Sequence, residues 1–283
     1  MTARSAQVSF LVDALRAGDA GAAESAALLL LSGGMPLSEL YDEVVLPFFA
    51  ALLLDPAMGG MRLVDEHLAS RAAVDLVMLL GRRQTPWTAD ANGAGGRGVI
   101  VLGAVPRESH LLGVRMLAQV LTGRGWTVHL LDSLPYEVLA SYCAALPVKP
   151  QAIGLTLHSA ASAAALRSGV GALRTALPDV PIVLGGAAVV ANPGLPAKVG
   201  AAAGAVDLNG GVAAVELVTN PLTRREREIL GLVASGASNA QIATRLSVHS
   251  STVKTHLEHV AGKLGTSDRT AAAVQGLRRG WID

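Results

Sequence analysis

The stretch GVIVLGAVPRESHLLGVRMLAQVLTGRGWTVHLLD, residues 98–132, decides the fold. It begins with a short β-branched run that ends in glycine and alanine at 98–104. A polar loop then leads into a helical pattern at 110–122, and a second apolar run follows at 126–132. A strand, a helix and a second strand in this order predict a parallel pair joined by a crossover helix.

The same alternation continues to residue 219. Further strands are expected at 151–157, at 181–186 and in a short unit at 204–219, with helices at 135–146 and up to residue 177. The predicted fold class of this part is α/β, a doubly wound, Rossmann-like parallel sheet of five strands with helices on both faces. Ligands of such sheets bind beyond the carboxyl ends of the strands, so the loops after residues 104, 157 and 184 are the candidate site.

Helical segments are expected on either side of this sheet. Residues 1–85 contain helix-length apolar patterns at 8–16, 20–31, 36–54 and 62–81, which predict a helical bundle acting as a cap. Residues 86–97 are polar and glycine-rich, as is typical of a linker. The sheet domain is assigned to 98–219, and an all-α domain of four short helices to 220–283. In the last domain Thr223 and Glu226 have the spacing of a capping box.

Composition narrows the classes of function. The chain of 283 residues is 51% hydrophobic and 16% charged, which is too apolar for a disordered protein. Its longest apolar runs are about 11 residues against the roughly 20 that span a membrane, so a cytoplasmic protein without a membrane partner is expected. The single cysteine, Cys143, excludes a disulfide framework and is expected to be a packing residue. Residues 220–283 hold nine basic and five acidic residues, which favours a polyanionic partner.

The loop after the first strand carries E-S-H-L-L-G at residues 108–113. An imidazole at the mouth of the sheet can bind a metal through one nitrogen while a carboxylate accepts the hydrogen of the other. A histidine at a strand end is more often an ordinary polar loop residue, and E-x-H alone is not specific. No second protein ligand lies nearby in the sequence, so a metal carried by a macrocycle fits better than an all-protein centre.

Two later motifs add to this loop, Thr-Leu-His at 156–158 and Gly-Gly at 185–186. Together the three resemble the cobalamin-binding domain of methionine synthase, mutases and cobalamin-dependent photoreceptor regulators. The resemblance implies that His110 is the lower axial ligand of cobalt, that Glu108 orients it, and that Thr156 and the glycine pair line a slot for the nucleotide tail. The cofactor implied is adenosylcobalamin or a form with another upper ligand. The cofactor-binding residues expected in this domain are Glu108, Ser109, His110, Gly113, Thr156, His158, Gly185 and Gly186.

The helical segment resembles the cap of the same family. That cap is marked by a Trp, a Gly three residues later, and Glu-His ten and eleven residues after the Trp. Gly59, Glu66 and His67 match, whereas Pro56 stands at the Trp position. The resemblance implies that Glu66 and His67 bind the cofactor near its upper ligand; the alternative is an exposed helical pair with no role. The departure at Pro56 leaves open which upper ligand is held and whether light is sensed.

The tail resembles the LuxR-type helix-turn-helix family, in LTRREREILGLVASGASNAQIATRL (222–246) and SVHSSTVKTHLEHVAGKLG (247–265). Apolar positions 242, 243 and 246 on its second helix and 253, 257, 260 and 264 on its third would pack together. Short polar side chains are left on the outer face, as on a recognition helix. The resemblance implies a double-stranded DNA partner, with Lys254 the expected phosphate contact. The expected DNA-binding residues are Ser251, Thr252, Lys254, Thr255 and His256.

These features indicate a regulator and not an enzyme. The leading hypothesis is a cobalamin-dependent, light-responsive transcription regulator in which the bound corrinoid controls oligomerisation or DNA binding. A homo-oligomer, dimer or tetramer, would match symmetric half-sites. The alternatives are a corrinoid carrier for methyl transfer, a regulator that senses cobalamin or redox state without light, and a regulator whose sheet domain is empty or binds haem.

Overall fold

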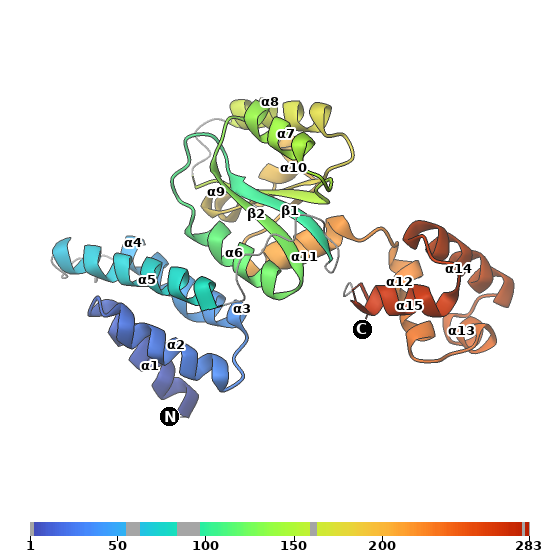
Figure 1. Cartoon of the computed structure of the whole chain (residues 1–283), viewed down its shortest axis with the longest axis horizontal. Helices are drawn as coiled ribbons and strands as arrows, with labels where there is room; N and C mark the ends of the chain where they lie inside the picture. The colour runs from blue at the N-terminus through green and yellow to red at the C-terminus, as the bar shows by residue number, and fades with distance from the viewer. Residues whose placement is uncertain (1–2, 55–62, 84–96, 159–162, 279–280, 283) are drawn as a thin grey trace. The chain divides into compact units, whose positions relative to one another are not determined.

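The computed structural model describes residues 3–54, 63–83, 97–158, 163–278 and 281–282 (Figure 1). The chain divides into two compact units, one of residues 1–94 and 98–215 and one of residues 95–97 and 216–283. Within the described ranges, none of the helices combines the length and the apolar character that crossing a membrane requires.

The first unit contains the expected parallel sheet. Its strands are β1 (Gly98–Ala104), β2 (Trp126–Ser133), β3 (Ala152–Thr156), β4 (Ile182–Gly185) and β5 (Ala203–Gly204). They pair in parallel in the order β2-β1-β3-β4-β5, which confirms the doubly wound, Rossmann-like α/β prediction. The chain order reverses between β1 and β3, and the carboxyl ends at such a switch point are where ligands bind.

Helices cover both faces of the sheet (Figure 1). They are α6 (Leu112–Gly123), α7 (Tyr136–Ala145), α8 (Ala163–Ala176), α9 (Ala187–Ala191), α10 (Leu195–Val199) and α11 (Leu208–Thr219). Helices α7 and α8 lie on one face and α6 and α11 on the other. Residues of β1, β3 and β4 share a buried cluster with α7 and α8, and Cys143 lies in it at 2% exposure, as expected of a packing residue. The short helices α9 and α10 were not predicted.

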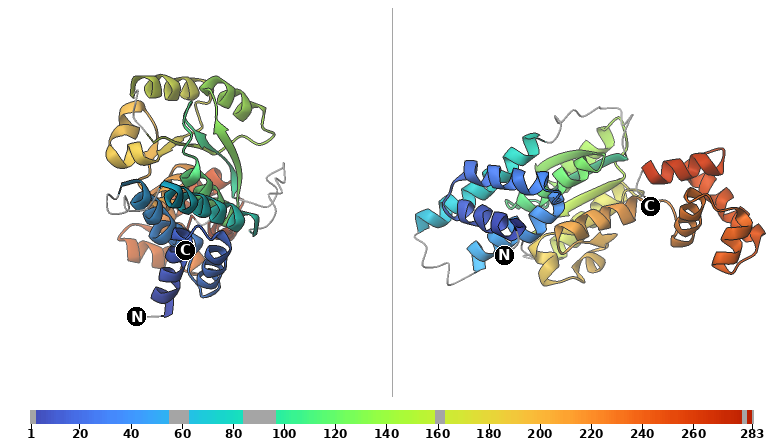
Figure 2. Two further views of the ribbon diagram at one scale, coloured as in Figure 1. Left: turned by 90° about the vertical axis from the view of Figure 1, so that its left-hand side faces the viewer. Right: turned by 90° about the horizontal axis from the view of Figure 1, so that it is seen from below.

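The N-terminal helices are α1 (Ala3–Arg16), α2 (Ala20–Ser32), α3 (Leu37–Leu40), α4 (Leu46–Leu54) and α5 (Leu63–Arg83). Helices α1, α2 and α5 lie side by side (Figure 2). The single helix expected at 36–54 is interrupted by a π-helical turn, η1 (Tyr41–Val45), that the sequence did not predict. Residues 86–96 of the expected linker lie outside the described residues.

The second unit is helical, with α12 (Arg224–Ala234), α13 (Asn239–Leu246), α14 (Ser250–Leu264) and α15 (Arg269–Arg278). The capping box at Thr223 and Glu226 is present at the start of α12, and Ser238 and Gln241 form a second one at α13. The apolar stripes expected on the second and third helices meet in one core, with Ile242, Val253 and Val260 among its buried residues. These stripes therefore fix which side of α14 faces outward.

Candidate functional site

The loop between β1 and α6 is organised by the carboxylate of Glu108, whose side chain is 9% exposed. Its Oε1 accepts hydrogen bonds from the backbone N–H groups of Ser109 and His110, both at 2.9 Å, and lies 2.7 Å from Nδ1 of His110. Its Oε2 accepts the backbone N–H of His158, in the loop after β3, at 2.6 Å. One carboxylate therefore links the loops that follow two adjacent strands, β1 and β3.

These contacts define the state of the His110 ring. Burial raises the pKa of Glu108, but the hydrogen bonds from His110 and His158 lower it by more, so this pKa lies below its ordinary value. An ionised carboxylate can only accept, so Nδ1 of His110 carries a hydrogen, and in the neutral ring the lone pair is then on Nε2. Because the ring is 60% exposed, the loop presents a ready-made nitrogen donor at the edge of the sheet.

The backbone of this loop is held in an uncommon conformation. Arg107, immediately before Glu108, has a φ of +70°, in the left-handed region that side chains other than glycine rarely adopt. Such conformations cost of order 1–3 kcal/mol and cluster at functional sites. Arg107 lies in the turn that brings the carboxylate of Glu108 to the backbone N–H groups of Ser109 and His110.

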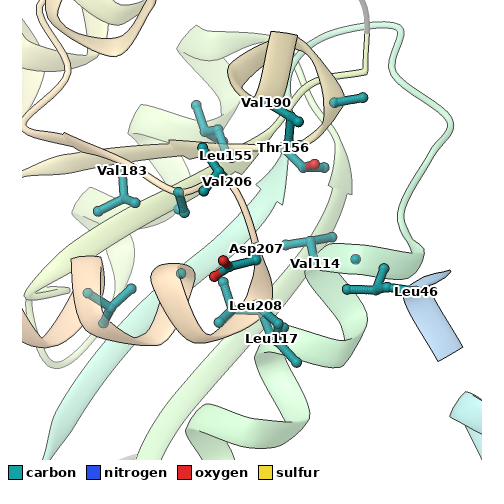
Figure 3. A pocket seen from close by; sticks show the side chains of 18 residues that line it. Leu46, Val114, Leu117, Leu155, Thr156, Val183, Val190, Val206, Asp207 and Leu208 are labelled. Carbon is teal, nitrogen blue, oxygen red and sulfur yellow. The ribbon is translucent and has the colours of Figure 1, made fainter. Parts of the chain in front are cut away.

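A mostly apolar pocket of about 210 Å³ lies at the carboxyl end of the sheet, between the strands and helices α6 and α11 (Figure 3). Gly113, the last residue of the E-x-H-x-x-G motif, lines it, so the pocket reaches the C-terminal end of that motif. Thr156 contributes a hydroxyl to the wall, and Leu46 of α4 and Leu208 of α11 contribute apolar side chains.

Gly186 is required for the shape of this pocket. Its φ of +97° is one that other residues rarely adopt, and a Cβ there would lie 2.5 Å from the carbonyl oxygen of Leu157 and 2.7 Å from Oγ1 of Thr156. Thr156 is in register with both Ala104 and Gly185. The three motifs, far apart in sequence, are therefore level with one another across the sheet.

This arrangement fits a group that brings its own metal and extends into an apolar pocket. One imidazole donor is oriented and exposed, and beside it lies a pocket walled by glycine, alanine and aliphatic side chains. Within the described residues, no cluster of three or more His, Cys, Asp or Glu side chains could hold a metal ion. A centre with a single protein ligand, as haem and corrinoids have, matches this donor set better than an all-protein metal site.

In the second unit, helix α14 presents a polar face opposite its buried stripe. Ser251, Thr252, Lys254 and Thr255 are exposed, and His256 is half-buried. The ammonium of Lys254 lies 3.9 Å from the carboxylate of Glu258, on the next turn. An exposed helix of this kind, with short polar groups near its start and a cation beside them, can enter the major groove of DNA.

An ion pair between a buried carboxylate and a partly exposed lysine fixes α14 against α12. Glu226 is 3% exposed, and its Oε2 accepts hydrogen bonds from the ammonium of Lys263 and from the backbone N–H of Thr223, both at 2.7 Å. Burial raises the pKa of Glu226, but the bonds from Lys263 and Thr223 outweigh it and leave that pKa below its ordinary value. Glu226, which completes the capping box of α12, thus also holds the C-terminal end of α14 through Lys263.

Residues 98–217 match the family model of the B12 binding domain. This segment is a B12-binding domain. The fold is also that of the monomethylamine corrinoid protein of Methanosarcina barkeri, with a TM-score of 0.57 over 73% of this chain and 96% of that one, at 14% identity. At that identity the likeness shows the fold alone.

Residues 220–275 match the family model of bacterial regulatory proteins of the luxR family. The chain therefore joins a B12-binding domain to a LuxR-type domain. The HTH-type transcriptional regulator MalT of Yersinia pestis (strain Pestoides F) is 48% identical over 60 residues, which are 21% of this chain. The chain covers only 7% of the length of that regulator, so the similarity concerns the LuxR-type domain.

The structure brings together the residues expected in the B12-binding domain. Ser109 and His158 both donate backbone N–H groups to Glu108, and Gly113, Thr156, Gly185 and Gly186 line the pocket. His67 is exposed on α5, and Glu66 lies on the same helix. The matching Gly59 and the departure at Pro56 lie outside the described residues, so the cap roles of Glu66 and His67 stay predictions.

Several residues that shape the site had no sequence signal. Asp42 of η1 accepts hydrogen bonds from the backbone N–H groups of Leu208 and Asn209, at 2.9 and 3.0 Å, and so caps α11 from 166 residues away. The hydroxyl of Tyr41 donates to Oε1 of Gln119 on α6 at 2.5 Å. These bonds dock the N-terminal helices onto the B12-binding domain. Nothing local in the sequence marks Asp42 or Tyr41, because their partners are set by the tertiary fold.

Proposed function

We propose that this chain is a cobalamin-dependent transcription regulator in which the bound corrinoid controls DNA binding or oligomerisation. The observation that supports it best is the pairing of Glu108 with Nδ1 of His110 beside a glycine-walled pocket, in a chain that also carries a LuxR-type domain. The two family matches together fit a regulator rather than an enzyme. A chromosomal target agrees with the cytoplasmic location expected from the sequence.

In this proposal each residue of the loop has one task. His110 would hold the cobalt through Nε2, and Glu108 holds the ring in the tautomer that leaves this nitrogen unprotonated. Thr156, Gly185 and Gly186 line the slot for the nucleotide tail. Bound cobalamin would supply a cobalt centre whose upper ligand can be exchanged or lost.

The DNA contacts are assigned to the exposed face of α14. Lys254 contacts phosphate, and Thr252, Thr255 and His256 face the groove, with Ser251 at the start of the helix. A dimer or tetramer would place two such helices on symmetric half-sites.

Light is the proposed signal, with direct sensing of cobalamin or of its redox state as the alternative. The signal alters the form of the bound cofactor. It can change the conformation of the protein only if two conformations bind that form with different affinities. The N-terminal helices, docked on the B12-binding domain through Asp42 and Tyr41, are the part whose position such a change would bias. Glu66 and His67 on α5 are proposed to lie towards the upper ligand.

The deciding experiment is an absorbance spectrum of the protein purified with adenosylcobalamin, recorded in the dark and after illumination. The proposal expects a bound corrinoid whose spectrum changes on illumination and whose DNA affinity changes with it. A protein that binds no corrinoid would refute the proposal. A bound corrinoid that light does not alter would remove only the photoreceptor version. Corrinoid binding without any DNA binding would favour a carrier for methyl transfer.

The role of His110 is tested with His110→Ala against His259→Ala, which removes an exposed imidazole from α14. Replacement of the ligand should weaken cobalamin binding by more than about tenfold, since even outer-shell partners of metal ligands are worth 10–100-fold. Titration followed by absorbance measures the affinity. Equal affinity and an unchanged spectrum in the His110 variant would refute the ligand assignment.

The phosphate contact is tested with Lys254→Ala against Lys149→Ala, an equal loss of charge in the first unit, where Lys149 pairs with Asp179. DNA affinity should fall several-fold in the first variant only, and the slope of log K against log salt should decrease by about one. An unchanged salt slope would contradict the assignment.

A further inference from the structure

A second imidazole lies against the proposed cobalt ligand. His158 follows β3 and His110 follows β1, and their rings stack with centroids 4.2 Å apart and planes at 19°. Both side chains are exposed at the edge of the sheet. The stack is a contact between two loops that only the parallel pairing of β1 with β3 makes neighbours.

The stack and the carboxylate of Glu108 restrain different motions of the His110 ring. The bond from Nδ1 to Oε1 fixes one edge of the ring but leaves the ring able to tilt about that edge. A parallel ring on one face opposes this tilt. The backbone N–H of His158 is itself held by Oε2 of the same carboxylate at 2.6 Å, so the stacking ring is anchored to the group that orients its partner.

An exposed ligand needs such restraint. The side chain of His110 is 60% exposed, so close packing does not hold its ring as it would in a core. Immobilising a side chain at the moment of binding lowers affinity, and restraint beforehand removes that cost. Offset parallel rings attract each other and remain flat against one another.

We propose that His158 is a positioning residue, whose ring holds the His110 imidazole in the plane from which Nε2 reaches the cobalt. The inference rests on the proposed function, because it concerns the use of His110 as an axial ligand. In this role His158 acts through the flat face of its ring, and neither ring nitrogen is needed. A phenyl ring at this position should therefore replace it, whereas a methyl group should not.

The test compares His158→Ala, which removes the ring, with His158→Phe, which keeps a flat ring without nitrogen. His259→Ala serves as the matched loss of an exposed imidazole. Dissociation constants for adenosylcobalamin are measured in the dark by absorbance titration, together with the fraction showing the histidine-ligated spectrum. The Ala variant should bind about five- to tenfold more weakly with a smaller ligated fraction, and the Phe variant should stay within about twofold of wild type.

A second measurement uses the cobalamin-free protein, so it stands even if no corrinoid binds. The ring protons of His110, observed by NMR, should carry the upfield shift caused by a stacked ring in wild type and in His158→Phe, and should lose it in His158→Ala.

Three results from the His158 variants would overturn the inference: wild-type affinity and spectrum in the Ala variant, a Phe variant that binds as weakly as the Ala variant, or His110 ring shifts that do not change on substitution. Failure of wild type to bind cobalamin would instead count against the proposed function. Retention of the histidine-ligated spectrum in His110→Ala would identify His158 as the ligand and refute its positioning role.

Discussion

Replacement of Gly186 by alanine tests whether the pocket depends on one backbone conformation. Gly186 has φ +97° and ψ 176°, a combination that residues with a Cβ pay of order 1–3 kcal/mol to adopt. The new methyl would also lie 2.5 Å from the carbonyl oxygen of Leu157 and 2.7 Å from Oγ1 of Thr156. Thr156 is the last residue of β3, the middle strand of the sheet, and Leu157 follows it directly, so neither atom can move aside freely.

The loss of stability in Gly186→Ala is the sum of the backbone cost and the cost of the steric overlap. Overpacking in a tight site adds about 1–3 kcal/mol to the backbone cost, so the free energy of unfolding should fall by roughly 3 kcal/mol or somewhat more. For a unit of this size each kcal/mol lowers the melting temperature by about 2–4 °C, so a decrease of roughly 6–12 °C is expected. Displacement of Thr156 should also narrow the pocket and weaken cobalamin binding.

Gly171→Ala is the matched control. Gly171 lies exposed on α8, and a Cβ there would meet no atom within 4 Å. Alanine in a helix is favoured over glycine by about 0.5–1 kcal/mol, so this variant should melt slightly higher than wild type. Thermal unfolding followed by circular dichroism, with a cobalamin titration, measures both variants. If Gly186→Ala melts at or above wild type and binds cobalamin equally well, the assignment of Gly186 as an obligatory glycine is wrong.

Two further predictions concern charged groups. Asp42→Asn should lower the melting temperature through a loss of about 1 kcal/mol. The amide NH2 would face one of the two N–H groups of α11 that the carboxylate now caps, and the negative charge at the helix start would be gone. Glu43→Gln, an exposed neighbour, should leave the melting temperature unchanged, and equal melting of both variants would contradict the cap. The second prediction is a pH dependence. Because the pKa of Glu226 is lowered in the folded state, its stabilisation is present above the unfolded pKa and is lost as the pH falls through the folded one. Urea unfolding should therefore show stability falling below about pH 5, less steeply in Glu226→Gln; the same slope in both would exclude Glu226 as a source.

The sequence predicted the strands of the sheet closely, because buried parallel strands have an unmistakable pattern of continuous apolar runs ending in glycine. Each of the first four begins and ends within about one residue of its expected range. The π-helical turn at 41–45 was missed, since its residues also fit an ordinary helix. What distinguishes it is the engagement of Tyr41 and Asp42 with α6 and α11, a property of the tertiary fold.

The part of the site that depends on local sequence was also predictable. The pairing of Glu108 with His110 spans two residues, so local chemistry was enough to expect it. The contacts of His158 depend on the register that sets Ala104 beside Thr156, and a single sequence does not reveal that register. The same limit applies to Leu46, which lines the pocket from a helix more than a hundred residues away from the ends of β3 and β4.

Helix α11 has a mechanical consequence for the molecule. Its first turn is held by Asp42, one of its sides supplies Leu208, Gly211 and Val215 to the pocket, and only four residues separate its last residue, Thr219, from α12. Twelve helical residues form a stiff rod of about 18 Å. The residues that line the pocket and the last turn before α12 therefore belong to one continuous rigid element.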